Sequence, residues 1–141
     1  MEFKVRIPFV EHLGMTLERF EPGVAALAVE LRPELTNTWG VAHGGVLMTL
    51  LDIAMAVAAR SADPKALGAV TVEMKTTFIG PCRGVLVAEG VCIHAGSSVS
   101  FCEGEARDST GRVVARASGT FMVRRARPAA EALPPDAVAG S

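Results

Sequence analysis

The stretch GVLMTLLDIAMAVAA, residues 45–59, decides the fold, because it reads as one long helix that is apolar on nearly all sides. Only Thr49 and Asp52 carry polar side chains in it. Such a helix must be covered on most sides, and a curved antiparallel sheet wrapped around it would do so. The stretch is shorter than the roughly 18–20 residues that span a bilayer, and Asp52 lies at its centre. We therefore expect a core helix and no membrane.

The rest of the chain reads as strands separated by turn residues. Residues 8–14 form a helical lead-in, and residues 33–43 form a loop rich in Pro, Asn, Thr and Gly before the helix, which ends near Ser61. Alternating apolar residues and turn pairs predict strands at 16–21, 24–32, 69–79, 85–94, 98–108 and 113–124. In the strand at 69–79, the alternation places Val70, Val72, Met74 and Phe78 on one face and Thr71, Glu73, Lys75 and Thr77 on the other.

This pattern predicts an α+β fold in one domain, residues 1–125. Residues 126–141 are rich in Ala and Pro with few large apolar groups, so we expect a disordered tail. The exposed sheet edges and the leftover apolar surface of the helix favour a partner subunit. We expect a homodimer at minimum, and a homotetramer built as a dimer of dimers.

Charge and cysteine usage exclude several classes of function. The 14 Lys and Arg are balanced by 15 acidic residues and are scattered, which argues against a nucleic-acid surface. The N-terminus lacks the apolar core of a secretory signal, and an odd number of cysteines fits reduced thiols in a cytoplasmic protein. Cys82, Cys92 and Cys102 form no CxxC pair, so no metal site is expected.

Asp52 and the residues before the helix indicate the chemistry. A carboxylate inside an apolar helix carries a desolvation cost, so proteins seldom keep one there without a partner or a task. His43-Gly44-Gly45 precedes the helix and offers backbone N–H groups at its N-terminus. A buried acid near backbone donors suits acyl chemistry.

These residues also carry a family resemblance. Asn37, His43-Gly44-Gly45 and Asp52, at their spacing, followed by VTVEMKTTF at 70–78 and by Gly80-Pro81, resemble the hotdog-fold acyl-CoA thioesterases of the phenylacetic-acid-degradation type. The likeness extends over about residues 10–124. It implies the hotdog fold, a curved antiparallel sheet around one long central helix, and hydrolysis of an acyl-CoA or related thioester without a cofactor.

The resemblance also implies roles for individual residues. Asp52 would act as general base or nucleophile, the Gly44 N–H would bind the thioester carbonyl, and Thr71 would orient Asp52 or water. Asn37 would position substrate or water, and His43 would shape the oxyanion site. Further substrate contacts are expected at Gly45, Thr49, Trp39, Gly96 and Ser97. The hairpin at Ala95–Ser98 lacks the basic residue that many relatives use for a nucleotide phosphate, which leaves Lys75, Arg83, Arg124 and Arg125 as candidate substitutes.

Structural interpretations of the same residues stay open. Asp52 could be a structural carboxylate bonded to Thr49 or to the backbone, and His43 could only cap the helix. Thr71 could be an ordinary strand residue, and the two glycines could serve close packing. Trp39 could cover an acyl pocket or fill a subunit interface. Met48 and Met55 could line either the core or an acyl tunnel.

Helix geometry adds an independent constraint. Gly44 and Asp52 are eight residues apart, which is about 12 Å along a helix. Both must come within about 3 Å of the reacting atoms, so one chain alone cannot place them on the same carbonyl. The sequence therefore predicts sites shared between two chains. The alternatives are a non-catalytic acyl-CoA binder and, less favoured because the helix has no histidine after His43, a hydratase or dehydratase.

Overall fold

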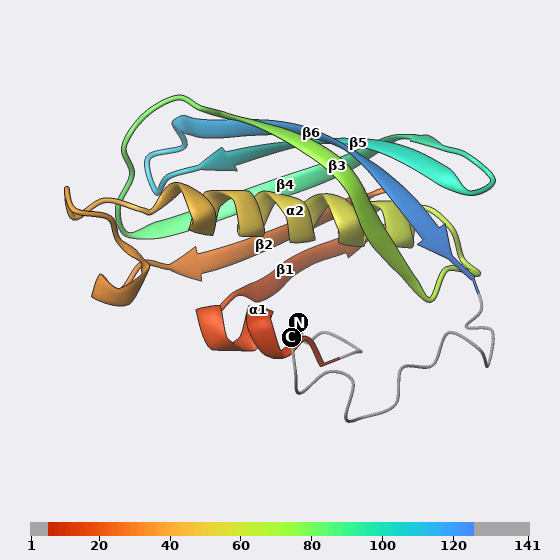
Figure 1. Cartoon of the computed structure of the whole chain (residues 1–141), viewed down its shortest axis with the longest axis horizontal. Coiled ribbons are helices and arrows are strands. Elements are labelled where there is room, and N and C mark those ends of the chain that lie inside the picture. Colours follow the sequence, from red (N-terminus) through yellow and green to blue (C-terminus); the bar gives the residue numbers. More distant parts are fainter. Residues whose placement is uncertain (1–5, 126–141) are drawn as a thin grey trace.

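One curved sheet wraps around a single long helix in the computed structural model, which describes residues 6–125 (Figure 1). The predicted tail, 126–141, lies outside the described residues. The elements are α1 (Pro8–Leu13), β1 (Thr16–Glu21), β2 (Val24–Glu30), the 3-10 helix η1 (Pro33–Leu35), α2 (Gly44–Ser61), β3 (Gly68–Phe78), β4 (Val85–Ala95), β5 (Val99–Arg107) and β6 (Val113–Arg124).

The strand order is β1-β2-β4-β5-β6-β3, and every neighbouring pair is antiparallel. Strands β1 and β3 form the two edges, and α2 lies across the concave face (Figure 1). The α+β hotdog architecture expected from the sequence is confirmed. Most boundaries agree to within one residue, and two differences are larger. The strand expected at 24–32 ends at Glu30, and the expected loop holds η1, which begins at Pro33 because proline has no N–H for a ladder.

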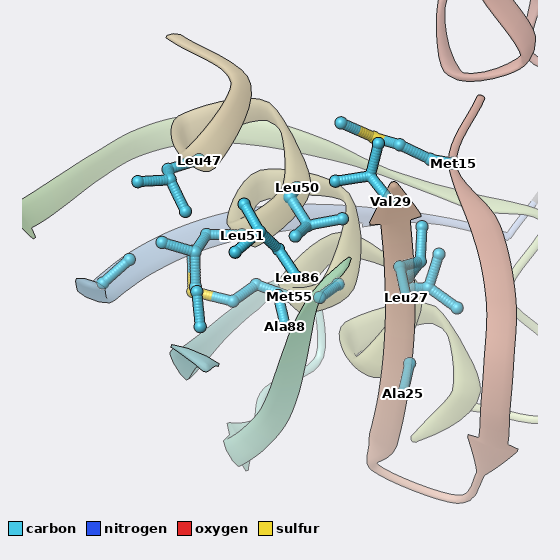
Figure 2. Close-up of a cluster of buried hydrophobic side chains, with 14 of the residues drawn as sticks. Met15, Ala25, Leu27, Val29, Leu47, Leu50, Leu51, Met55, Leu86 and Ala88 are labelled. Atoms are coloured by element: carbon cyan, nitrogen blue, oxygen red, sulfur yellow. The ribbon is translucent and has the colours of Figure 1, made fainter. Parts of the chain in front are cut away.

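The core is the contact between α2 and the centre of the sheet. Leu50, Leu51 and Met55 of the helix are fully buried, and Figure 2 shows them facing side chains of β2 and β4. The helix approaches the sheet closely at Gly90 of β4, where a Cβ atom would lie 2.4 Å from the carbonyl oxygen of Ala54. The buried position of Met55 assigns it to the core, whereas Met48 is 40% exposed.

The alternation expected along β3 holds from Glu73 onward but is wrong before it, at Thr71. The pairing of β3 with β6 shifts register between Thr71 and Glu73, so an extra residue interrupts the alternation there. Thr71 consequently faces α2, as does Met74, although the pattern placed these two on opposite faces. Three apolar side chains of this edge strand remain more than half exposed: Val70, Val72 and Phe78.

One face of α2 is also left uncovered by the sheet. Its residues recur every three or four positions and are exposed or half-buried: Gly45, Met48, Thr49, Asp52, Ala56 and Arg60. We call this set the open face of α2. A helix this apolar is expected to bury such a face against another surface. Because Asp52 belongs to this set, the open face is where the candidate functional site is expected.

Candidate active site

A hydrogen bond between β3 and α2 fixes the carboxylate of Asp52. The hydroxyl of Thr71 donates to Oδ1 of Asp52 at 2.6 Å, whereas Thr49 donates to the carbonyl of Gly45 at 2.8 Å. The alternative in which Thr49 holds Asp52 is therefore wrong. Asp52 is half-buried in the single chain, not fully buried. Within residues 6–125 no donor reaches its Oδ2, which leaves that oxygen free for chemistry.

His43 is the N-cap of α2. Its backbone is extended, with φ −63° and ψ 138°, and its Nδ1 accepts the N–H of Gly45 at 2.9 Å. Its own N–H donates to the carbonyl of Leu35. One ring nitrogen is thus occupied by the cap, which favours positioning of the helix start over proton transfer for His43.

Gly44 carries the available backbone donor at this helix start. It is the first residue of α2, and in the described part of the chain its N–H meets no acceptor, whereas the N–H of Gly45 is taken by His43. A helix N-terminus attracts negative charge. A Cβ atom at Gly44 would lie 3.2 Å from Cε1 of Phe78, so glycine permits the close approach of that ring.

Asn37 organises the loop that leads to this turn. Its Oδ1 accepts the N–H of Trp39 at 2.9 Å and, more weakly, that of Val41 at 3.4 Å. Its backbone N–H donates to the carbonyl of Val41, and its carbonyl accepts the N–H of Gly40. These two hydrogen bonds close the loop. Trp39 is 81% exposed, so in the single chain it is not packed into a core; it lies at the rim of an open pocket that Arg83 also lines.

The hairpin at Gly96 and Ser97 is contacted by Arg125, the residue that follows β6. One guanidinium nitrogen of Arg125 donates to the carbonyl of Ser97. Among the other candidate substitutes, Lys75 lies on the outer face of the sheet with Glu103 and Arg116, and Arg83 lies beside Trp39 at the other end of α2. Arg124 pairs with Gly68 in the ladder. Arg125 is the candidate cation whose hydrogen bond to the hairpin the structure shows.

Sequence reasoning missed two residues beside that hairpin. Lys65 follows the end of α2, and Ser100 begins the buried side of β5. Neither carried a motif signal, because their proximity to Arg125 depends on how α2, β5 and β6 meet.

The cysteines lie inside the fold in the reduced state. Cys92 and Cys102 are opposite each other on β4 and β5, and Cys82 lies buried after β3. Burial, and then the neighbouring Cys92, raise the pKa of the Cys102 thiol, and burial raises that of Cys82. Among the described residues, no three His, Cys, Asp or Glu side chains gather as metal ligands.

Asp52 and Gly44 both lie on or beside the open face of α2, at the separation that one helix imposes. A carboxylate with one free oxygen and a backbone N–H without an acceptor are the parts that a hydrolytic site requires. In one chain these parts lie about 12 Å apart, so they cannot meet the same carbonyl group.

Comparisons of this chain with known proteins point to one family. Residues 40–115 match the model of the thioesterase superfamily. A protein of Saccharolobus solfataricus, named only as a possible esterase, is 31% identical over 126 residues, which cover 89% of each chain. The medium/long-chain acyl-CoA thioesterase YigI of Escherichia coli is 26% identical, with 86% of this chain and 88% of that protein covered.

A solved structure supports the fold independently. The PaaI protein from the phenylacetic acid degradation operon of Escherichia coli superposes with a TM-score of 0.76 over 82% of this chain and 83% of that one, at 24% identity. The matched residues 40–115 include the Gly44 turn, Asp52 and Thr71. On the family match, on the 31% identical relative and on the fold, this chain belongs to the thioesterase superfamily.

Proposed function

We propose that this protein is an acyl-CoA thioesterase that acts as a homodimer, with Asp52 of one chain and the Gly44 N–H of its partner at each site. The observation that carries the proposal is the Asp52–Thr71 hydrogen bond on the open face of α2, eight residues from Gly44, whose N–H meets no acceptor among residues 6–125. The medium/long-chain acyl-CoA thioesterase YigI, a relative along most of the chain, supports the substrate class.

Two-fold symmetry brings the parts together. If Asp52 of one chain faces Gly44 of the other, then symmetry makes the reverse pair as well, and the two α2 helices run antiparallel. The midpoint between the two residues is Met48, which therefore lies near the two-fold axis. Met48 is 40% exposed in the single chain, and pairing would bury it with the rest of the open face.

The edge strand β3 would join the same interface. Val70, Val72 and Phe78 are exposed, and β3 has no second neighbour among the described strands. Exposed apolar side chains beside an unpaired strand edge are typical of surfaces that associate. The outer face of β4 also exposes Val85, Val87 and Val91, which supports a further pairing of dimers into a tetramer.

The chemistry follows from the two halves of the site. The Gly44 N–H donates to the carbonyl oxygen of the thioester, where negative charge develops as the tetrahedral intermediate forms. Asp52, held through Oδ1 by Thr71, takes a proton from the attacking water through Oδ2, or attacks the carbonyl carbon itself. The C–S bond then breaks, and the thiolate leaves and takes up a proton. In the general-base route the free acid remains at once; in the nucleophilic route a mixed anhydride with Asp52 remains, and water hydrolyses it to the free acid and regenerates the carboxylate.

The proposal is tested by a thiol-release assay on a panel of acyl-CoAs that differ in chain length and in aromatic or aliphatic character. Hydrolysis with release of free coenzyme A supports the proposal. Binding of acyl-CoA without thiol release would instead make the protein a binder, and hydration of an enoyl-CoA without thiol release would make it a hydratase. The mass of the protein in solution, from light scattering, must be that of a dimer or a higher even assembly.

A further inference from the structure

We propose that Cys92 and Cys102 are a modification site, at which a hydroperoxide forms a reversible disulfide bond across strands β4 and β5. The two residues are direct partners in the antiparallel pairing of these strands, and both are free thiols in the structure. Side chains of directly opposed residues lie on the same face of a sheet. Both sulfur atoms therefore lie on the core side, where Cys102 belongs to the core and Cys92 packs against it.

The hydrogen-bond pattern sets the separation of the two residues. The N–H of Cys92 donates to the carbonyl of Gly23 at 2.8 Å, so the backbone of Cys92 bonds toward β2 and not toward β5. Cys92 and Cys102 are therefore a non-hydrogen-bonded pair, in which the Cα atoms lie about 4.5 Å apart. Disulfides usually join Cα atoms that are about 4.4–6.8 Å apart, so the bond can form without a change of register.

The two thiols differ in their access to solvent. Cys102 is 1% exposed, whereas Cys92 is half-buried. Cys92 lies where the cover of α2 ends, because its partner Gly23 donates its own N–H to Oγ of Ser61, the last residue of that helix. Figure 1 shows the β4–β5 hairpin extending past this end of α2. An oxidant in solution therefore meets Cys92 before Cys102.

The electrostatics of Cys102 support the same order of reaction. Burial raises the pKa of the Cys102 thiol, and the charge and hydrogen bonding of the neighbouring Cys92 raise that pKa further. The thiolate is the form of cysteine that attacks an oxidant, so Cys102 is poorly suited to react first. The same hydrogen bond means that the two thiol groups are in contact, as the second step requires.

The oxidation takes two balanced steps. The sulfur of Cys92 attacks hydrogen peroxide, the O–O bond breaks, water leaves, and Cys92 carries a sulfenic acid. The sulfur of Cys102 then attacks that sulfur, an S–S bond forms, and the S–O bond breaks. The hydroxyl group leaves as a second water with the proton of Cys102. Two electrons pass from the thiols to the peroxide, and a dithiol returns them when it reduces the disulfide.

The pair protects the core from irreversible oxidation. Without a neighbouring thiol, a sulfenic acid proceeds with more peroxide to a sulfinic acid, which carries charge and is not reduced by dithiols. At Cys92 that charge would lie against the core beneath the end of α2, where it is costly. Capture of the sulfenic acid by Cys102 stops the oxidation at a neutral, reversible product.

Cys82 is a built-in control because it lies at the other end of the central helix. Its carbonyl accepts the N–H of Ala42, just before α2, whereas Cys92 lies beside the last turn of that helix. The 18 residues of α2 separate these ends by about 27 Å, so Cys82 cannot join the pair.

The test treats the folded protein with hydrogen peroxide, alkylates the remaining thiols in denaturant and measures peptide masses. Trypsin cuts after Arg83 and Arg107 and nowhere between them, so one peptide, 84–107, holds both members of the pair and another holds Cys82. Peptide 84–107 should lose two hydrogen atoms and take no alkyl group, while Cys82 remains alkylated. Dithiothreitol should restore both thiols, and cleavage by chymotrypsin at Phe101 should leave two peptides joined by the bond. Cys82→Ala should give the same result for the pair.

Removing the second thiol tests the protective role. After peroxide, Cys102→Ala should carry two added oxygen atoms on Cys92 and lose about 3–5 °C in Tm, whereas the Tm of the wild type should not fall. The wild-type peptide masses decide the proposal even if Cys102→Ala fails to fold. Oxygen addition without a bond would overturn it, as would a bond between two chains or no reaction at a peroxide concentration that oxidises free cysteine. None of these measurements depends on thioester hydrolysis.

Discussion

Thr71 and Asp52 are joined by a 2.6 Å hydrogen bond that crosses from the edge strand β3 to the central helix α2. The two residues can meet because the register of β3 shifts just after Thr71, which turns that hydroxyl toward the helix. The bond fixes one carboxylate oxygen, and no donor among residues 6–125 reaches the other, which lies on the face of α2 that the sheet does not cover.

Replacing the carboxylate should abolish most of the activity without unfolding the protein. We expect Asp52→Asn to lower kcat about 100-fold or more, because it removes the base or nucleophile and keeps the shape. Steady-state kinetics gives the rate, and circular dichroism with gel filtration checks the fold and the assembly. Glu73→Gln, a matched change on the same strand as Thr71, should retain activity. Near-native turnover of a folded Asp52→Asn variant would remove Asp52 from the mechanism.

Removing the Thr71 hydroxyl should weaken the positioning of Asp52. We expect Thr71→Ala to lower kcat about tenfold, because the carboxylate loses its one donor in the described part of the chain. Thr71→Ser keeps the hydroxyl and should stay within about twofold of wild type. Thermal melting measures stability alongside the kinetics. Equal losses in both variants would mean that packing of the methyl group, and not the hydrogen bond, is what matters.

Mixing two inactive variants should restore activity if the sites are shared. The parents are Asp52→Asn and Gly44→Pro. Proline is well tolerated at the first position of a helix, which Gly44 occupies. Among the backbone N–H groups of the turn, it removes only the one of residue 44. In a mixed dimer one site carries both lesions and the other carries neither. Random assortment makes about half the dimers mixed, so activity should recover to roughly a quarter of wild type.

Gly44→Ala is the control for this experiment. It introduces the same contact with Phe78 as proline does, at 3.2 Å, but keeps the N–H donor. It should therefore retain much more activity than Gly44→Pro. If heterodimers form, as shown by two affinity tags, and no activity returns, then each site uses a single chain and the shared-site proposal is wrong.

The contact between α2 and β4 should be intolerant of any added atom. We expect Gly90→Ala to reduce the free energy of unfolding by about 3 kcal/mol, because its Cβ would overlap the Ala54 carbonyl at 2.4 Å and neither backbone can yield. Gly68→Ala, where a Cβ atom has nothing within 4 Å, should change it by less than about 0.5 kcal/mol. Urea unfolding measures both. Equal stability of the two variants would show that the helix can shift away from the sheet.

Deleting residues 127–141 should leave melting temperature and activity unchanged. The expectation rests on composition, because a segment rich in Pro and Ala with few large apolar groups buries little surface. Differential scanning calorimetry and the thiol-release assay provide the measurements. A clear loss of either property would show that the segment packs on the body of the protein or on a partner.

Local residues determined the elements of this protein. Turn pairs such as Pro22-Gly23 separate alternating apolar segments, and these set all six strands to within two residues. The apolar stretch at 45–59 determined the central helix, and the histidine and glycines before it determined where the helix begins. Each of these signals acts between residues close in sequence, which is why composition and spacing reveal them.

Tertiary structure decided which of those residues meet. The bulge in β3 turned Thr71 inward, against the simple alternation, because β3 pairs only with β6, from more than forty residues later in the chain. The cap formed by His43 takes the N–H of Gly45, so that of Gly44 is the one without an acceptor in the described part of the chain. Arg125 reached the hairpin at Ser97 only because the start of β5 lies beside the end of β6. Long-range pairing determines such contacts, and no local pattern in the sequence encodes them.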